Sequence, residues 1–452
     1  MSNSITNDFD TVSAAAWKQK IQVDLKGADY NKTLLTQTNE GITIKPFYHA
    51  DDFEKLTITT QNTDLNICEK IWVSFEKKAN KKALDVLNRG ANSIKFTCTK
   101  HFDFTVLFHE LLHKKIEFHF DFHFYDTDFI LELSDFLSKE TVFYNLDFIG
   151  HLAAKGNWIK NQPQDIEQLK KILTLRPRTN IISVNTAIYQ NAGANTVQQV
   201  AYALAHANEY LSAFGGEIAP YIQFNNAIGS NYFFEIAKLR ALRYLYPLIC
   251  KEYQVETSTQ LFCEPSLRNK TIYDYNVNML RTTTECMSAI LGGAQTISNQ
   301  PYDHLFLKTN EFGERIARNQ LVILKEESHF NNGQHLANDS YYIESITQQI
   351  ATKALKLFKE IEKNGGFIKQ LKQGTIQRKI SENAKKEQAQ FDDGSLVLLG
   401  SNKYPNPLDQ MKNVVELSLF KKKQGHKTAI TPIIGIRLAE ASEKTRINTE
   451  NQ

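Results

Sequence analysis

Short apolar runs alternate with longer helical patterns along most of this chain, and this alternation limits the folds that it can adopt. Eight runs carry the β-branched and aromatic side chains that are typical of strands: residues 70–75, 93–98, 116–122, 141–147, 180–186, 220–226, 260–265 and 304–309. Strands that alternate with helices imply parallel strands joined by helical crossovers. Eight such units favour an α/β fold with a closed (β/α)₈ barrel of the TIM type over its rival, a doubly wound open sheet.

The segments between these runs show helical periodicity and end at glycine. The pattern over 197–216 closes on two glycines, in the position where glycine commonly ends a helix. Over 277–291, four residues have the spacing of one buried helix face: Leu280, Thr284, Met287 and Leu291. Another apolar stripe comes after the last predicted strand: Ile343, Ile346, Ile350, Leu357 and Ile361. These patterns predict helices that cover the outside of the barrel.

The charge balance and the cysteines limit the function classes. The chain has 53 Lys and Arg against 50 Asp and Glu, a net charge of +3, which argues against nucleic acid or an anionic membrane as the main partner. The N-terminus lacks the pattern of a secretory signal, and no apolar window is long enough for a membrane span. The five cysteines are widely spaced without a Cys-x-x-Cys pair, so we expect neither disulfides nor a cysteine zinc site. A reduced, cytoplasmic location is therefore predicted.

In such barrels the chemistry lies at the carboxyl ends of the strands. Polar or reactive side chains at those ends are the candidate site residues: Cys98, Asp121, Asp147, Asn185, Thr186, Asn225, Asn226, Cys263, Glu264 and Lys308. Most of them are neutral, and no pair of carboxylates beside a base stands out. The chain also lacks the Gly-x-Gly-x-x-Gly, P-loop and Gly-x-Ser-x-Gly motifs, so the sequence supports neither a nucleotide site nor a nucleophile elbow.

Two histidine-containing motifs suggest metal binding. His109, Glu110 and His113 form a His-Glu-x-x-His pattern, which on a helix places two imidazoles on one face beside a glutamate that activates zinc-bound water. The surrounding residues are those of a crossover helix with both histidines on its polar side, so a zinc hydrolase is a remote alternative. The run 118–124 alternates phenylalanine with two histidines and an aspartate, which we interpret as a strand with one polar face rather than a metal site.

One segment, from Val277 to Asp303, begins with the distinctive sequence Val-Asn-Met-Leu-Arg-Thr-Thr-Thr-Glu. Further blocks occur in order at 24–48, 150–158, 189–210, 225–243, 396–406 and 437–446. In these blocks the chain resembles the coenzyme B12-dependent acyl-CoA mutases, above all the methylmalonyl-CoA mutase family. The resemblance implies a (β/α)₈ barrel whose axis holds the CoA chain. It also implies interconversion of succinyl-CoA and (R)-methylmalonyl-CoA, with the radical chemistry supplied by adenosylcobalamin.

The positions that are catalytic in this family are degenerate here. Ile188 stands where catalytic subunits have the histidine of a Tyr-His-Met-Gln-Glu motif, and isoleucine cannot donate a hydrogen bond to a thioester carbonyl. Phe262 and Glu264 stand in a Phe-His-Thr-Gln-Thr motif, and Lys70 aligns with the tyrosine that drives the adenosyl group off cobalt. The cobalt-binding Asp-x-His-x-x-Gly motif does not occur after Asp303. We therefore expect no catalytic, cofactor-binding or metal-binding residue in this chain.

This combination looks like the small (β) subunit of the heterodimeric bacterial enzyme. The resemblance implies a non-catalytic chain without the C-terminal flavodoxin-like cobalamin-binding domain, paired with a catalytic large subunit that carries adenosylcobalamin. It divides the chain into an N-terminal arm that contacts the partner (1–65), the barrel (66–370) and a C-terminal helical and strand extension packed on the barrel, with a flexible tail (371–452). The alternative is a barrel that binds an acyl-CoA and becomes active with a separate cobalamin-binding protein. Ile188 and Phe262 at the strand ends disfavour this alternative, whereas tight binding of a CoA thioester to the isolated chain would favour it.

Overall fold

A barrel of parallel strands forms the centre of the molecule. The computed structural model describes residues 10–59, 64–175, 180–420 and 427–450. Within them, eight strands form the barrel in chain order: β3 (Asn66–Val73), β4 (Ser93–Cys98), β5 (Glu117–Phe122), β6 (Thr141–Leu146), β7 (Asn180–Asn185), β8 (Ile222–Ile228), β9 (Gln260–Pro265) and β10 (Thr296–Ile297). The last strand, β10, pairs with both β9 and β3 and so closes the barrel. The predicted (β/α)₈ barrel is confirmed, and the open-sheet alternative is wrong.

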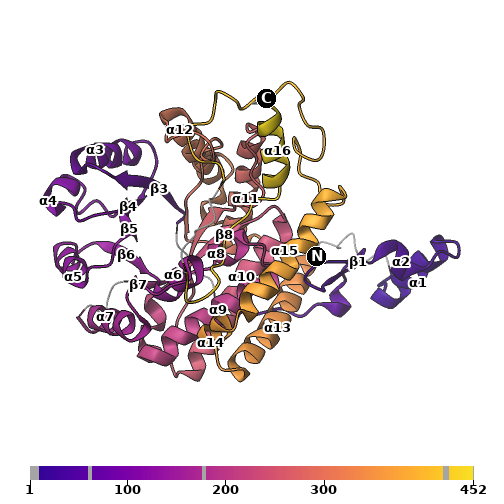
Figure 1. The fold of residues 1–452 in the computed structure, drawn as a ribbon. Coiled ribbons are helices and arrows are strands. Elements are labelled where there is room, and N and C mark those ends of the chain that lie inside the picture. The colour runs from indigo at the N-terminus through magenta and orange to yellow at the C-terminus, as the bar shows by residue number, and fades with distance from the viewer. Residues whose placement is uncertain (1–9, 60–63, 176–179, 421–426, 451–452) are drawn as a thin grey trace, which may run out of the picture.

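Helices surround the barrel where the sequence pattern predicts them. The longer ones are α3 (Glu76–Leu87), α5 (Thr127–Phe136), α7 (Gln162–Leu175), α9 (Thr196–Phe214), α10 (Tyr232–Glu252), α11 (Val277–Gly292), α12 (Glu311–Val322) and α13 (Tyr341–Lys363). Shorter helices follow three of the strands: α4 (Phe104–Leu107), α6 (Phe148–Lys155) and α8 (Ala187–Asn191). Figure 1 shows α3, α4, α5 and α7 along the left side and α9, α10 and α13 across from them. No described helix is both long and apolar enough to cross a bilayer.

Side chains alternate along the strands between the helix layer and the barrel interior. On β5, Phe118 and Phe120 are buried against the ring of Phe108, beneath the crossover that leads from β4 to β5. His119 and Asp121 lie on the other face, where His119 packs inside the barrel and Asp121 lines a cavity at its end. The alternation predicted for 118–124 is confirmed for 118–121, but β5 ends at Phe122 and does not include His123 and Phe124.

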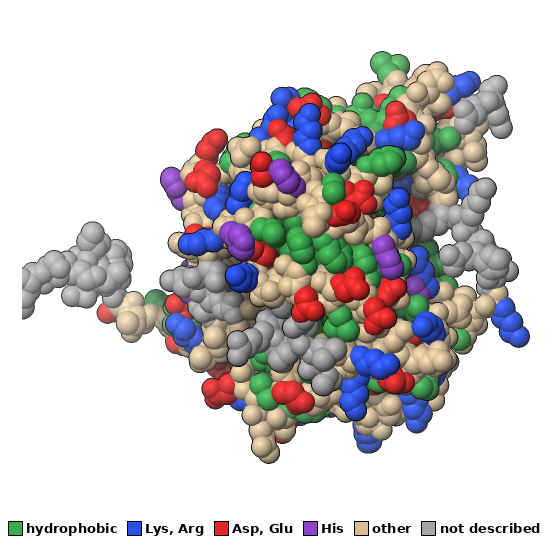
Figure 2. All heavy atoms as spheres, turned by 90° about the vertical axis from the view of Figure 1, so that its left-hand side faces the viewer, with side chains coloured by type: hydrophobic (Ala, Val, Ile, Leu, Met, Phe, Trp, Pro, Cys, Tyr) green, Lys and Arg blue, Asp and Glu red, His purple; other side chains and the backbone are tan. Residues whose placement is uncertain are grey.

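The outer layer is thin between β4 and β5, because α4 has only four residues. Aromatic rings take the place of a longer helix there. Phe104 lies 5.1 Å from Phe129 and 5.6 Å from Phe136, measured between ring centroids. Figure 2 looks onto this side of the molecule and shows hydrophobic side chains at the surface between charged ones.

The eighth strand lies elsewhere than the apolar runs predict, so the strand predicted at 304–309 is wrong. Those residues form turns, and Phe306 is buried with Ile272 and Met411 in a hydrophobic cluster separate from the barrel core. The eighth strand is the two-residue β10, inside the segment with the mutase-like sequence. An apolar run indicates that its residues are buried, but it does not distinguish a barrel strand from a buried turn, which explains the error. The first strand begins at Asn66, earlier than predicted.

Helix α11 packs inward with a face other than the apolar one that its spacing predicts: polar residues near its start, and Cys286, Ala289 and Ile290 nearer its end. The residues of the predicted buried face are exposed or half-buried: Leu280, Thr284, Met287 and Leu291. Asn278, Thr282 and Glu285 are buried in their place. Lys270 Nζ donates to both carboxylate oxygens of Glu285, at 2.8 and 2.7 Å, with neither side chain exposed beyond 1%. The predicted face is therefore wrong, because hydrogen bonds to the preceding loop decide which side of the helix packs inward.

The glycine that ends α11 also makes room for a neighbour. Gly293 has φ +94°, and a Cβ there would lie 2.0 Å from Nη1 of the buried Arg243. We expect Gly293→Ala to lower the free energy of unfolding by about 3 kcal/mol, because backbone strain and a clash add together. Gly374 also has a positive φ, but nothing described lies within 4 Å of its Cβ, so Gly374→Ala should cost about 1 kcal/mol. Urea unfolding measures both losses, and equal losses would contradict the clash.

An N-terminal arm extends from the barrel. It contains α1 (Ala14–Asp24), α2 (Tyr30–Leu34) and a hairpin of β1 (Thr36–Gln37) and β2 (Thr43–Ile44). Figure 1 shows the arm at the right, where α1 and α2 point away from the barrel. Residues 1–9 and 60–63 of the predicted arm lie outside the described residues.

A C-terminal segment follows the barrel and runs along its rim. It begins with α14 (Phe367–Lys372) and α15 (Thr375–Asp392) and ends with α16 (Glu440–Glu450). Before α16, the amide of Ile433 donates to the carbonyl of Ala153 and the amide of Ile436 to that of Asn191. These contacts hold the segment against α6 and α8, at the end of the barrel where the strands finish. The predicted flexible tail includes 421–426 and 451–452, which lie outside the described residues.

Candidate functional site

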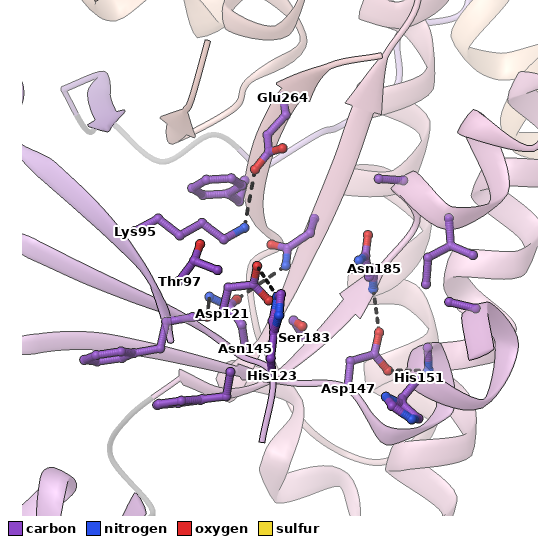
Figure 3. Close-up of a pocket in the computed structure, with 18 of the residues that line it drawn as sticks. Lys95, Thr97, Asp121, His123, Asn145, Asp147, His151, Ser183, Asn185 and Glu264 are labelled. Atoms are coloured by element: carbon purple, nitrogen blue, oxygen red, sulfur yellow. Dashed lines mark hydrogen bonds and ion pairs between the residues drawn. The ribbon is translucent and has the colours of Figure 1, made fainter. Parts of the chain in front are cut away.

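A cavity of about 760 Å³ lies at the C-terminal end of the barrel, where the strand ends meet. Its polar and charged lining comes from strands around the barrel, from the residue after β5 and from α6 with its cap: Lys70, Lys95, Thr97, Asp121, His123, Asn145, Asp147, His151, Lys155, Ser183, Asn185, Asn225, Asn226 and Glu264. Figure 3 shows the labelled side chains converging on this space. A second cavity of about 940 Å³ lies beside the first. Four residues line both cavities: Lys70, Trp72, Ala187 and Glu264. The two cavities together form the mouth of the barrel.

Three charged side chains meet in the first cavity. Glu264 from β9 accepts hydrogen bonds from Lys70 of β3 at 2.5 Å and from Lys95 of β4 at 3.3 Å. Burial alone would raise the pKa of Glu264, but the two ammonium groups outweigh it and lower that pKa to about 2. Burial likewise acts to lower the pKa of Lys95, but Glu264 and Asp121 outweigh it, so that pKa is raised. The carboxylate and Lys95 therefore stay charged at neutral pH, and neither changes its protonation state there.

Aromatic rings fill the barrel axis beside this charged cluster. The His119 ring stacks on Phe143, with centroids 4.3 Å apart, and lies 5.0 Å from the ring of Phe262. Lys95 Nζ lies 4.5 Å from the centroid of the same Phe262 ring. Burial lowers the pKa of His119, so its ring is neutral and packs as an aromatic side chain. The axis is filled at this level and forms the floor of the cavity.

Amide side chains form the wall opposite the charged cluster. Asn145 has φ 52° at a register shift between β6 and β7, which aims its side chain across the barrel. Its Oδ1 accepts from Gln223 Nε2 at 2.9 Å, and its Nδ2 donates to the carbonyl of Phe120 at 3.1 Å. Gln223 also donates to Asn225 Oδ1 at 2.8 Å. These amides satisfy one another, so the wall is rigid and uncharged.

Asp147 is the most extensively bonded carboxylate of the site. It accepts from His206 Nε2 at 2.9 Å, from the hydroxyl of Tyr210 at 2.9 Å, and from the amides of Gly150 and Asn185 at 2.7 and 2.9 Å. Burial alone would raise its pKa, but His206 and the two amides outweigh burial and hold the pKa below the usual range. The carboxylate thus joins α6, α9 and β7, and its hydrogen bonds are structural.

Because of the charged cluster, we expect the free energy of unfolding to depend on pH in the acid range. Because the pKa of Glu264 is lowered from 4.5 to about 2, its stabilisation is complete above pH 4.5 and is lost as the pH falls to about 2. Glu264→Gln should therefore lower the free energy of unfolding at pH 7 by up to about 3 kcal/mol. Urea unfolding across pH should show the gap between the variant and the wild type closing between pH 4.5 and 2. A gap that does not change with pH would contradict this.

Most of the predicted strand-end residues reach the cavity. Six line it: Asp121, Asp147, Asn185, Asn225, Asn226 and Glu264. Cys98 and Cys263 are buried in the barrel wall, and burial raises the pKa of both thiols. Thr186 is buried and donates to Asn226 Oδ1 at 2.8 Å. Lys308 does not lie at a strand end, because 304–309 forms turns and loop rather than a strand, but it lines the second cavity.

The four positions that the resemblance to the mutases marks as degenerate also line the mouth. Lys70, Ile188, Phe262 and Glu264 all border the first cavity. Sequence reasoning missed Lys95, although a signal for it exists. A lysine in the middle of the strand at 93–98 has to face either the helix layer or the barrel axis. A buried lysine needs a carboxylate partner, and on the axis that partner is Glu264.

The zinc-hydrolase hypothesis is wrong. Helix α4 ends at Leu107, and the residues that follow form turns, in which Glu110 and His113 have positive φ values of 59° and 63°. The side chains of His109 and His113 are each 70% exposed and do not share a helix face. In the part of the chain that the structure describes, no three His, Cys, Asp or Glu side chains are placed to hold a metal ion.

Comparisons with known proteins agree with the barrel and its signature segment. A family model described as methylmalonyl-CoA mutase matches residues 139–446. The methylmalonyl-CoA mutase small subunit of Porphyromonas gingivalis is 32% identical over 98% of this chain and 78% of its own length. The methylmalonyl-CoA mutases of Cereibacter sphaeroides and Escherichia coli are 38% and 35% identical over 50% and 53% of this chain, but over only 34% and 35% of their own lengths. The chain therefore belongs to the methylmalonyl-CoA mutase family and is a homologue of its small subunit.

Proposed function

We propose that this chain is the non-catalytic small subunit of a heterodimeric, adenosylcobalamin-dependent methylmalonyl-CoA mutase. In the holoenzyme it supports a catalytic large subunit that interconverts succinyl-CoA and (R)-methylmalonyl-CoA. The observation that carries the proposal is the filled barrel axis. Family members hold the CoA chain along that axis, whereas here His119, Phe143 and Phe262 occupy it next to the Lys95–Glu264 ion pair.

The residues at the mouth also lack the groups that the reaction needs. Ile188 borders the cavity at the position where catalytic subunits have a histidine, and it offers no donor to a thioester carbonyl. Phe262 replaces a second histidine, and its ring is buried in the floor. A ligand that reached the cavity would meet the amide wall, the paired charges of Lys70, Lys95 and Glu264, and the side chains of His123, His151 and Lys155.

Adenosylcobalamin supplies a carbon-centred radical when it is bound to the holoenzyme. The two histidines that are fully buried in the described residues, His119 and His206, do not fit a cobalt ligand. His206 bonds to Asp147 through Nε2 and to the hydroxyl of Tyr189 through Nδ1, so both nitrogens are engaged. His119 is fully buried between two aromatic rings. We expect the cofactor on the large subunit, in the cytoplasm, where five buried free cysteines stay reduced.

Reconstitution tests this function. This chain and a catalytic large subunit of the same organism are purified separately and together, and methylmalonyl-CoA and adenosylcobalamin are added to each. We expect no conversion by this chain alone, and a stable, active complex when both are present. Ile188→His restores a donor but not the space for CoA, so this variant alone should also stay inactive. Conversion by the isolated wild-type chain would overturn the non-catalytic role.

The alternative is an acyl-CoA-binding barrel that becomes active with a separate cobalamin-binding protein. The open mouth, with about 760 Å³ of polar space, is the observation that favours it. Titration of the isolated chain with methylmalonyl-CoA separates the two functions. Saturable binding that Ala187→Trp abolishes, at the mouth, would favour the alternative, and no binding would favour the small subunit.

A further inference from the structure

An aromatic surface lies where the N-terminal arm joins the barrel. We propose that this surface is the centre of the interface with the large subunit, a second mutase barrel, and this inference rests on the proposed function. Its residues, which we call the arm-root surface, are Tyr48, Phe53, Tyr232, Phe233, Leu336, Tyr341 and Tyr342.

Three segments far apart in the sequence supply these rings. Phe53 of the arm lies 4.8 Å from Tyr341, measured between centroids, and Tyr48 lies 5.2 Å from Tyr342. Phe233, at the start of α10, lies 5.3 Å from the same Tyr342 ring at the start of α13. Figure 1 shows the arm leaving the barrel beside α13. The rings therefore form one continuous patch rather than scattered surface residues.

Much of this patch faces solvent. Phe233 is 45% exposed, Tyr341 40% and Leu336 64%. Contiguous apolar surface of this kind is typical of protein interfaces, in which aromatic side chains are enriched and often dominate the binding energy. Beside the patch, Lys55 Nζ lies 2.7 Å from the carboxylate of Asp339, and the carboxylate of Glu54 accepts a hydrogen bond from Gln348. The patch carries no unpaired charge of its own that would select nucleic acid or a charged peptide.

The arm needs a partner on the same side of the molecule. None of the residues of α1 is buried in this chain, and Val12, Trp17 and Val23 are 56%, 44% and 71% exposed. A helix of this length is marginal in water unless another surface packs against it. The arm and the arm-root surface are continuous, so one partner can cover both.

The geometry of an arm exchange places that partner. When two homologous chains each extend an arm over the other, they are related by an approximate twofold axis, and equivalent surfaces meet across it. The points where the arms leave their barrels then lie close to the axis, because each arm has to cross it. The arm-root surface is therefore expected to face its counterpart on the homologous large subunit.

Two substitutions test the surface with little risk to the fold. Phe233 is the second residue of α10 after its cap Asn231, and Tyr341 is the first of α13 after its cap Ser340. Aspartate is favourable in the first turn of a helix, so Phe233→Asp and Tyr341→Asp should fold. The matched control is Phe312→Asp. Phe312 is 51% exposed and is the second residue of α12 after its cap Asn310, and Figure 1 shows α12 far from the arm.

The measurement is the dissociation constant of the complex between this chain and the large subunit, determined by interferometry with a tagged large subunit. We expect Phe233→Asp and Tyr341→Asp each to raise it by about tenfold or more, and Phe312→Asp to change it by less than about twofold. Unchanged binding of both arm-root variants would overturn the inference and leave the proposed function standing. No complex with the wild-type chain would overturn both. A homodimer of this chain that the same two variants dissociate would show that the occupant is a second copy, which also overturns the inference.

Discussion

Glu285→Ala is expected to lower the free energy of unfolding by about 3–5 kcal/mol, because it leaves the ammonium group of Lys270 buried without a counter-charge. Lys270 and Glu285 are 0% and 1% exposed, so water cannot replace the lost partner. Asn269 Nδ2 also donates to Glu285, at 2.7 Å, and would lose its acceptor. Helix α11 would then be free to rotate, and the loop before it would lose its main anchor.

A double variant separates the interaction energy of the ion pair from the cost of burying each charge alone. Lys270→Met combined with Glu285→Met removes both charges while keeping two long side chains, and we expect it to recover most of the loss. Urea unfolding of Lys270→Met, Glu285→Met and the double variant gives the coupling energy. Losses that simply add in the double variant would contradict a coupled ion pair.

Asp147→Ala is expected to cost about 3–5 kcal/mol as well, since it leaves several buried donors without an acceptor. The donors are His206, Tyr210 and the amides of Gly150 and Asn185. Because the pKa of Asp147 is held below its usual range, the loss should be full at neutral pH and should shrink as the pH falls through that lowered pKa. Urea unfolding at several pH values gives this dependence.

Tyr210→Phe provides a graded control for the same network. It removes one donor to Asp147 and one acceptor for the amide of Ile149, so we expect a loss of about 1–2 kcal/mol. The critical result is that Asp147→Ala should lower the free energy of unfolding more than Tyr210→Phe does. If Tyr210→Phe were as damaging as Asp147→Ala, the carboxylate would not be the centre of the network.

The barrel could be predicted because strands of a parallel sheet are covered on both faces and therefore read as apolar runs. Seven of the eight runs overlap the observed strands, and the alternation of histidine, aspartate and phenylalanine on β5 identified its two faces. Leu280 and Phe306 show where this reasoning fails. Leu280 has the spacing of a core residue but is 67% exposed, because buried hydrogen bonds turn α11 the other way. Phe306 is fully buried, but against Ile272 and Met411 rather than in the barrel wall.

The site could be predicted in part, because polar residues at strand ends converge by topology alone. The sequence identified Asp121, Asp147 and Glu264 in this way. It could not show that Lys70 and Lys95 both reach Glu264, because these two contacts join residues that are 194 and 169 positions apart in the sequence. The filling of the axis was equally hidden, because it depends on how rings from three strands stack and not on any one of them.

The two-residue β10 closes the barrel with few hydrogen bonds, and we call this closure the seam of the barrel. It pairs only with Asn66 and Ile67 on one side and with Phe262 and Cys263 on the other, whereas β3 and β4 are joined along Cys68–Val73. Breaking the few bonds of β10 turns the ring into a curved sheet with two edges, while every other junction stays paired. Amide protons of β10 should therefore exchange before those of β4. Under heat or load, the molecule should unzip first at this seam and keep the rest of its sheet.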